Sequence, residues 1–240
     1  MADKKDKPKY KSQDGFEEVR VYRGFTEIEN LFKLFSYPDS FICGGYVRYM
    51  CAPVTNPIPA GDVDIYSINE GAYKKLFNVF DKQMKLEAKH ENEVSLTFKK
   101  VTDKDHFLFG TPTIQLIKPL NEGAIVAGAD MQTILENFDF TVIRIGLKDK
   151  NVALADKDYI HDETHKVLRL KNIHCPLSST LRCMKYSKKG YWLPVVETLK
   201  LFTDWDERDD DYKIKLMDFL AKEDLSEEDV NELEKLLRID

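Results

Sequence analysis

The sequence lacks the features of several protein classes. Its four cysteines form no Cys-x-x-Cys pair, and a chain of 240 residues does not need disulfide staples. It contains no run of about 18 apolar residues, which excludes a transmembrane helix and a membrane partner. Residues 1–13 are polar and rich in lysine, without the apolar stretch of a secretory signal. Together these absences predict reduced thiols and a cytoplasmic protein.

Several catalytic and binding motifs are also missing. The sequence has no Gly-x-Ser-x-Gly motif, no P-loop and no dinucleotide-binding glycine pattern. His161, His165 and Cys175 supply one His-x₃-His spacing but no fourth zinc ligand, so we expect a surface helix there. The net charge of −6 differs from the basic charge of proteins that coat nucleic acid. Binding to a polynucleotide would therefore require a local basic patch.

What is present indicates a folded α+β protein. Hydrophobic residues make up 42% of the chain, which is enough for a core. The patterns predict a disordered polar arm (1–15), an α/β head (16–175), and a helical neck with the C-terminal region (176–240). Predicted strands cover 18–22, 40–43, 62–67, 94–98, 113–117 and 140–147. Predicted helices cover 26–35, 46–51, 70–83, 130–137, 177–189, 194–202, 212–222 and 226–238.

A glycine pair interrupts the chain between a predicted strand and a predicted helix. Gly44-Gly45 follows strand 40–43 and precedes helix 46–51. Glycine has no side chain, so a phosphate can approach its backbone closely. The first turn of a helix directs free N–H groups at such an anion. The pair therefore indicates a phosphate-binding turn.

Two aspartates alternate with apolar residues in the strand that follows. Asp62 and Asp64 are two residues apart, so their carboxylates point to the same face of the strand. Hard oxygen ligands of this kind bind Mg²⁺, and two such ions can activate a hydroxyl and stabilise a leaving pyrophosphate. Either motif alone is common in plain turns and strands, and their order along the chain makes the pair specific.

These motifs resemble a known family. Residues 41–48, Phe-Ile-Cys-Gly-Gly-Tyr-Val-Arg, followed by Gly-Asp-Val-Asp-Ile at 61–65, resemble the head of class II CCA-adding enzymes and bacterial poly(A) polymerases. That family belongs to the DNA polymerase β nucleotidyltransferase superfamily. Residues 136–142 resemble its Arg-Arg-Asp-Phe-Thr-Ile segment, and residues 177–191 its neck helix. The resemblance implies a nucleotidyltransferase fold, with a mixed sheet, flanking helices and a helical neck and tail.

The resemblance also implies roles for residues. Gly44, Gly45 and Arg48 would hold the triphosphate of an NTP. Asp62 and Asp64 would bind Mg²⁺ or Mn²⁺. Asp139 and Arg182 would lie at the nucleotide. Apart from the resemblance, the neck carries a basic cluster that fits either phosphate contacts with RNA or a solvated helix face: Arg182, Lys185, Lys188 and Lys189.

The sequence departs from the family at several positions. The neck motif Glu-Asp-x-x-Arg is Ser178-Ser179-x-x-Arg182, which removes the aspartate of the protein template for C and A. CCA addition is therefore not expected. Gln115 stands on the third strand where many members have a carboxylate, and an amide cannot act as a general base. The other replacements are Tyr49 after the family's arginine, and Asn137 and Phe138 in place of Arg-Arg.

The leading hypothesis is a Mg²⁺-dependent nucleotidyltransferase that moves a nucleoside monophosphate from an NTP to a hydroxyl, with an RNA 3′ end as acceptor. It would be a compact member of the kind that viruses of bacteria also encode. The alternative is a binding or interaction protein of the same fold with weakened catalysis, such as half of a toxin–antitoxin pair or a viral host modulator. Gln115 favours the alternative, and the complete glycine and aspartate set favours the enzyme.

Overall fold

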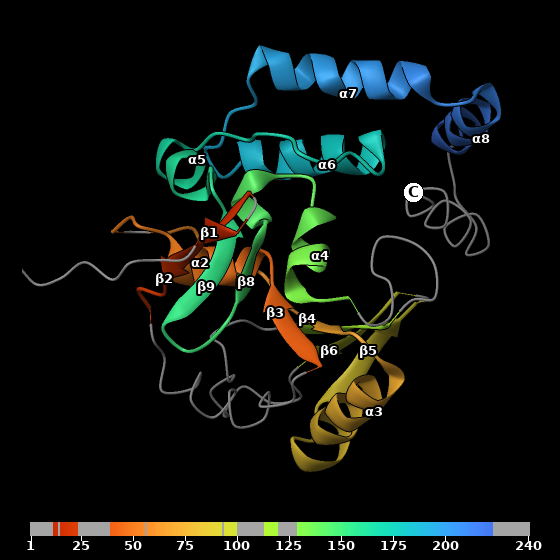
Figure 1. The fold of residues 1–240 in the computed structure, drawn as a ribbon. Coiled ribbons are helices and arrows are strands. Elements are labelled where there is room, and N and C mark those ends of the chain that lie inside the picture. The colour runs from red at the N-terminus through yellow and green to blue at the C-terminus, as the bar shows by residue number, and fades with distance from the viewer. Residues whose placement is uncertain are drawn as a thin grey trace, which may run out of the picture.

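The computed structural model describes residues 12–13, 15–23, 39–55, 57–92, 94–99, 113–119 and 129–222 (Figure 1). The predicted helices 26–35 and 226–238, and most of the predicted arm 1–15, lie outside these residues. Nothing in the described part therefore tests those three predictions.

A nine-stranded mixed sheet forms the centre of the fold. Its strand order is β1-β2-β9-β8-β3-β4-β7-β6-β5. Among the described pairings, β4 and β7 run parallel and every other pair is antiparallel. The strands are β1 (Ser12–Gln13), β2 (Phe16–Arg20), β3 (Ser40–Cys43), β4 (Val63–Ser67), β5 (Glu87–Glu91), β6 (Ser95–Lys99), β7 (Thr113–Ile117), β8 (Ile145–Leu147) and β9 (Val152–Asp156).

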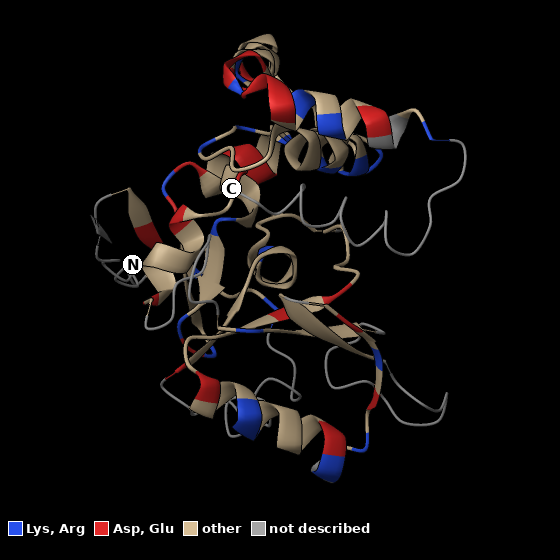
Figure 2. Cartoon of the chain, turned by 90° about the vertical axis from the view of Figure 1, so that its right-hand side faces the viewer, with Lys and Arg blue, Asp and Glu red and all other residues tan. Residues whose placement is uncertain are grey.

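Helices cover the sheet and extend beyond it. In both Figure 1 and Figure 2, α3 lies below the sheet, and α6 and α7 lie above it. Figure 2 also shows that α3 and the upper helices carry many charged residues, whereas the sheet between them is mostly tan. The helices are α2 (Gly45–Cys51), α3 (Glu70–Asn78), α4 (Met131–Glu136), α5 (Tyr159–His165), α6 (Pro176–Ser187), α7 (Val195–Glu207) and α8 (Asp210–Leu220).

Alternation along the strands divides the core between the two faces of the sheet. Val63 and Ile65 of β4 pack into the largest cluster, together with residues of α2 and α3. Tyr66 points to the other face, where it packs with Ile134 and Leu135 of α4. A third cluster joins the segment around residues 140–143 to α6 and α7. Asp62 and Asp64 share the parity of Tyr66, so they belong to the face that α4 and α6 cover.

Most predicted elements are confirmed, with shifted ends. Strands 40–43 and 113–117 match β3 and β7, and the neck helix begins at Pro176, a favoured first helical residue. Helix 70–83 divides into α3 and a π-helical turn, Val79–Gln83. The strand predicted over 140–147 is wrong, because Thr141–Ile143 is a 3₁₀ turn and β8 begins at Ile145. A short apolar run is buried in either conformation, so its pattern does not separate them.

The sequence patterns also left elements unassigned. β5 is fully exposed, so it has no apolar alternation, and β9 is a nearly continuous buried run. Helix α5 carries His161 and His165, as the surface-helix interpretation of these residues requires. None of the described helices combines the length and the hydropathy that a bilayer-spanning helix needs.

Candidate functional site

Gly44 makes the turn between β3 and α2. Its backbone has φ 82° and ψ −143°, a conformation that residues other than glycine rarely adopt. A Cβ atom at this position would lie 3.6 Å from Oδ2 of Asp64. Gly44 is also the N-cap residue of α2, so the cap residue places no side chain over the first turn of this helix. The glycine thus exposes backbone beside a carboxylate.

The two aspartates lie on the neighbouring strand. Antiparallel pairing of β3 with β4 sets Cys43 opposite Asp64, which brings the carboxylate beside the glycine turn. Parallel pairing of β4 with β7 sets Gln115 beside Asp64 on the other side. Asp62, Asp64 and Gln115 line one cavity of about 470 Å³, together with Gly44 and Gly45. Gly44 and Gln115, which are 71 positions apart in the sequence, therefore line the same cavity.

The electrostatics of Asp64 set it apart. Burial, and next the charge of Asp62, raise the pKa of Asp64 from 3.8 to about 7, while Lys185 and Arg182 act in the opposite direction. Its Oδ1 atom is buried and accepts no hydrogen bond from any described residue. A buried carboxylate oxygen without a donor is costly, and a bound cation would remove that cost.

The neck helix α6 forms the opposite wall of the cavity. Ser178, Arg182 and Lys185 line it, at the three- and four-residue spacing of one helix face. Asp139 lies behind this wall and is buried. Its Oδ1 accepts a hydrogen bond from Arg182 at 3.1 Å, and its Oδ2 accepts one from Ser179 at 2.9 Å. Burial raises the pKa of Asp139, and both of these donors lower it. Asp139 therefore fixes Arg182 instead of facing the cavity.

The structure does not bring Arg48 to the cavity, contrary to the role that the resemblance implies. Its side chain is 1% exposed, and its guanidinium donates to Oε1 of Glu163 at 3.3 Å, the hydroxyl of Tyr191 at 2.9 Å and the carbonyl of Ile58 at 2.7 Å. Lys166 also donates to Glu163, at 2.7 Å. With both terminal nitrogens directed into this network, Arg48 joins α2 to α5 and to the end of the neck.

The predicted basic patch of the neck is divided. Arg182 and Lys185 lie at the cavity, whereas Lys188 lines a separate apolar groove. Lys189 lies 5.3 Å above the ring of Tyr186, and burial lowers its pKa. Lys188 therefore lies apart from Arg182 and Lys185, whereas Lys189 is close enough to Lys185 and Asp62 for their charges to act on its pKa.

The cavity supplies a small set of metal ligands. Across the described residues, no group of three or more His, Cys, Asp or Glu side chains could hold a metal ion. Two carboxylates are nevertheless a common protein contribution for Mg²⁺, because substrate phosphates and water complete its coordination. The amide oxygen of Gln115 is a further neutral ligand. Asp62, Asp64 and Gln115 thus fit a cation that arrives with a nucleotide.

Sequence reasoning missed Glu163 and Tyr191, which accept hydrogen bonds from Arg48, and Lys166, which donates to Glu163. No local motif marks Glu163 and Tyr191, because their partner Arg48 is at least 110 positions away in the chain. Phe138 was noted as a replacement for an arginine. It lines the cavity and packs against Tyr66 at 5.6 Å between ring centroids. This wall of the site is therefore apolar.

No family model matches the sequence, and no curated protein matches it. Solved structures do share the fold. The Thermotoga maritima CCA-adding enzyme complexed with tRNA_CCA has a TM-score of 0.52 and 17% identity, over 93% of this chain and 51% of that chain. The apo form I of a CCA-adding enzyme has a TM-score of 0.51 and 15% identity, over 86% and 52%. The complex of a CCA-adding enzyme with CTP has a TM-score of 0.50 and 15% identity, over 91% and 54%.

The chain spans about half the length of these proteins. At such low identity the likeness concerns the arrangement of strands and helices, not the chemistry. The predicted fold class is confirmed: the chain has an α+β nucleotidyltransferase fold, with a mixed sheet and flanking helices.

Proposed function

We propose that the protein is a Mg²⁺-dependent nucleotidyltransferase that moves a nucleoside monophosphate from an NTP to a hydroxyl group. One observation carries this proposal. The glycine turn, Asp62 and Asp64 lie on one side of a cavity, and the cations Arg182 and Lys185 lie on the other. An anion with a bound cation would meet opposite charge on both sides.

The residues divide the work between them. Gly44 and Gly45 allow the triphosphate to approach the backbone, and Lys185 supplies the positive charge that Arg48 does not. Asp62 and Asp64 hold Mg²⁺, or Mn²⁺ in its place. When bound, the metal neutralises charge on the triphosphate and on the leaving pyrophosphate. Arg182, held by Asp139, orients the nucleoside end of the substrate.

The transfer needs no reactant other than the NTP and the acceptor hydroxyl. The oxygen of the acceptor hydroxyl bonds to the α-phosphorus, and the bond from that phosphorus to its bridging oxygen breaks. Pyrophosphate leaves with the electron pair, and the hydroxyl proton passes to solvent. Gln115 cannot accept this proton, because an amide is not a base at neutral pH.

We further propose an RNA 3′ end as the acceptor and the cytoplasm as the location. Structures with a similar fold include a CCA-adding enzyme complexed with tRNA, which supports RNA as the first acceptor to test. Addition of CCA itself is not proposed, because Ser179 replaces the template aspartate and donates to Asp139. The four cysteines are free and buried, as is usual in a reducing compartment.

The test is transfer of label from each α-³²P NTP to total RNA, with Mg²⁺ or Mn²⁺. Asp62→Ala and Asp64→Ala should each lower transfer by at least about 10²–10³-fold, the usual effect of removing one charge-stabilising group. Asp81→Ala removes an exposed aspartate on the far side of the sheet and should leave transfer unchanged. Equal activity in all three variants would disprove the proposed site.

A second candidate is a nucleotide-binding protein of this fold without turnover. Gln115 favours it, because this amide lies beside Asp64 where a third carboxylate would complete the charge of the site. For this candidate, the wild-type protein should bind NTP with Mg²⁺ without transferring label. Transfer that appears only in Gln115→Glu would identify Gln115 as the reason.

A further inference from the structure

A second hollow lies away from the candidate site, between α6, α7 and α8. It has a volume of about 680 Å³ and is lined mainly by apolar side chains. The lining residues of α6 and α7 recur at three- and four-residue spacing, so each helix turns one face toward it. Met184, Phe202 and Met217, one from each helix, are 57%, 65% and 56% exposed.

This exposure requires a partner. Single exposed apolar residues are ordinary, but a contiguous patch that spans three helices marks a surface that another segment covers. Among the described residues, Leu201 of α7 is buried in the cluster that contains Cys183 and Tyr186 of α6, whereas Phe202 beside it stays exposed.

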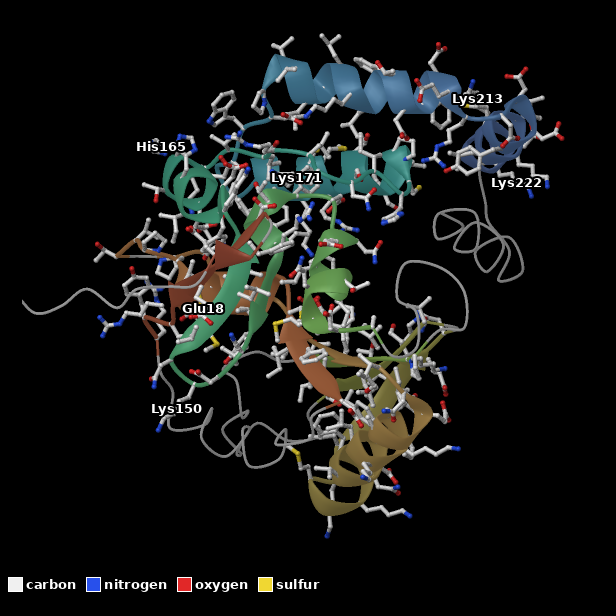
Figure 3. The ribbon with its side chains drawn as sticks, in the orientation of Figure 1. Glu18, Lys150, His165, Lys171, Lys213 and Lys222 are labelled. Carbon is white, nitrogen blue, oxygen red and sulfur yellow. The ribbon has the colours of Figure 1, made fainter. Side chains whose placement is uncertain are left out.

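The sequence that follows α8 has the required character. Figure 3 labels Lys222, the last described residue, just beyond the end of α8. Residues 226–238 then carry the helical pattern noted above, with Val230, Leu233 and Leu237 on one face. A helix over these residues would have 13 residues, as α7 does. The link between α8 and this helix, residues 221–225, has five residues and is within the usual range for helix–helix connections.

Charge favours the same occupant. Residues 223–240 contain eight acidic and two basic side chains. Lys188 is the one charged residue among the described residues that line the groove. An acidic amphipathic segment would therefore bring apolar residues to the groove and negative charge to Lys188.

We propose that residues 226–238 dock as an amphipathic helix in the groove between α6, α7 and α8 of the same chain. A short tether gives the segment an effective concentration in the millimolar range, far above that of a second copy at micromolar concentration. The groove thus closes within the chain and forms a four-helix C-terminal region.

The test is disulfide trapping in the full chain. Phe202→Cys with Leu233→Cys places one thiol in the groove and one on the apolar face of the segment. Phe202→Cys with Lys235→Cys is the matched control, because position 235 lies on the opposite helical face. The first pair should oxidise within one chain at least about tenfold faster than the control, given the high effective concentration.

Two outcomes would overturn the proposal. Equal rates for both pairs would show that the segment does not dock by this face. A disulfide between chains, formed at a rate that rises with protein concentration, would show that a second copy fills the groove. Circular dichroism of the reduced variants checks that both remain folded.

A second measurement leaves Phe202 in place. Leu233→Asp should raise binding of a hydrophobic fluorescent dye several-fold, because the groove opens. Asn231→Asp adds the same charge near the opposite face and should leave dye binding at the wild-type level. Dye binding that rises equally in both variants, or in neither, would contradict docking through Leu233.

Discussion

Two polar clusters lie close to the glycine turn, and they differ in how their charges are paired. Around Arg48, both terminal guanidinium nitrogens donate to Glu163, Tyr191 and a backbone carbonyl, and Nε alone is buried without a partner among the described residues, so the protein itself supplies most of the partners. Around Asp64, two carboxylates lie side by side, and a buried oxygen has no donor among the described residues. The first arrangement stabilises a fold, and the second requires something from outside.

This contrast assigns different work to residues of one short segment. Gly44 and Arg48 are four positions apart, but the glycine opens onto the cavity and the arginine points into the core. A charged residue in a binding motif is therefore not evidence of ligand contact until its own partners are known.

We call the cluster around Arg48 the closed cluster and the cluster around Asp64 the open cluster. The largest expected effect comes from removing the central charge of the closed cluster. Arg48→Met should lower the free energy of unfolding by about 3–4 kcal/mol, because Glu163 stays buried with less compensating charge. Urea unfolding followed by circular dichroism measures this change. Arg48→Met with Glu163→Gln should recover part of the loss, since the unpaired charge is gone. Unchanged stability combined with lost NTP binding would instead make Arg48 a phosphate ligand.

The Mg²⁺ affinity of the open cluster should depend on pH. Mg²⁺ binding requires an ionised Asp64, whose pKa is about 7 without metal. Well below that pH, affinity should fall about tenfold per unit, which gives about fiftyfold from pH 7 to pH 5, and above it the affinity should level off. Titration calorimetry over this range measures the profile. A flat profile would mean that Asp64 is not a ligand, and Asp81→Ala should reproduce the wild-type curve.

The same carboxylate should destabilise the metal-free protein. Because folding raises the pKa of Asp64 from 3.8 to about 7, the folded state binds the proton more tightly than the unfolded state. The free energy of unfolding therefore falls as pH rises between these values, and the loss is complete above about pH 7. At pH 8, Asp64→Asn should be more stable than wild type by about 2 kcal/mol, once solvent screening is allowed for.

Thermal unfolding at two pH values tests this sign. At pH 8 the gain corresponds to about 4–8 °C in Tm for a chain of this size. At pH 4 most of the difference should vanish, because Asp64 is then protonated in the folded state and only about half ionised in the unfolded state, where its pKa is 3.8. Saturating Mg²⁺ should raise the Tm of wild type and not that of Asp64→Asn. If Asp64→Asn is less stable than wild type at pH 8, then the ionised Asp64 carboxylate does not destabilise the metal-free folded protein.

The difference between the clusters also explains what the sequence could predict. Gly44, Asp62 and Asp64 were recognisable because turn and strand periodicity fix their placement locally. The partners of Arg48 depend on tertiary contacts over more than 100 residues, and no local pattern encodes them. The strand predicted over 140–147 failed for the related reason that burial alone does not decide backbone conformation. The site was thus predictable where its geometry is local.

Asp139 lies between the two kinds of cluster, and it gives the smallest and most discriminating prediction. It is buried and paired like Glu163, but its partner Arg182 lines the open cavity. Asp139→Asn keeps the shape and can still accept from Ser179, while Arg182 loses its charged partner. KM for NTP should rise about tenfold with kcat little changed, since a hydrogen bond to a charged group contributes about 1.5–3 kcal/mol, of which water recovers part.

Steady-state kinetics of the transfer reaction separate the two parameters, and direct NTP binding does so if turnover is absent. Asp158→Asn is the matched control, because Asp158 pairs with Lys171 and Arg169 away from the cavity. Its KM should equal that of wild type. A fall in kcat with KM unchanged would mean that Asp139 acts on the reacting phosphate and not through Arg182. In that case Asp139 would belong to the open cluster that contacts substrate, and not to the residues that only hold Arg182 in place.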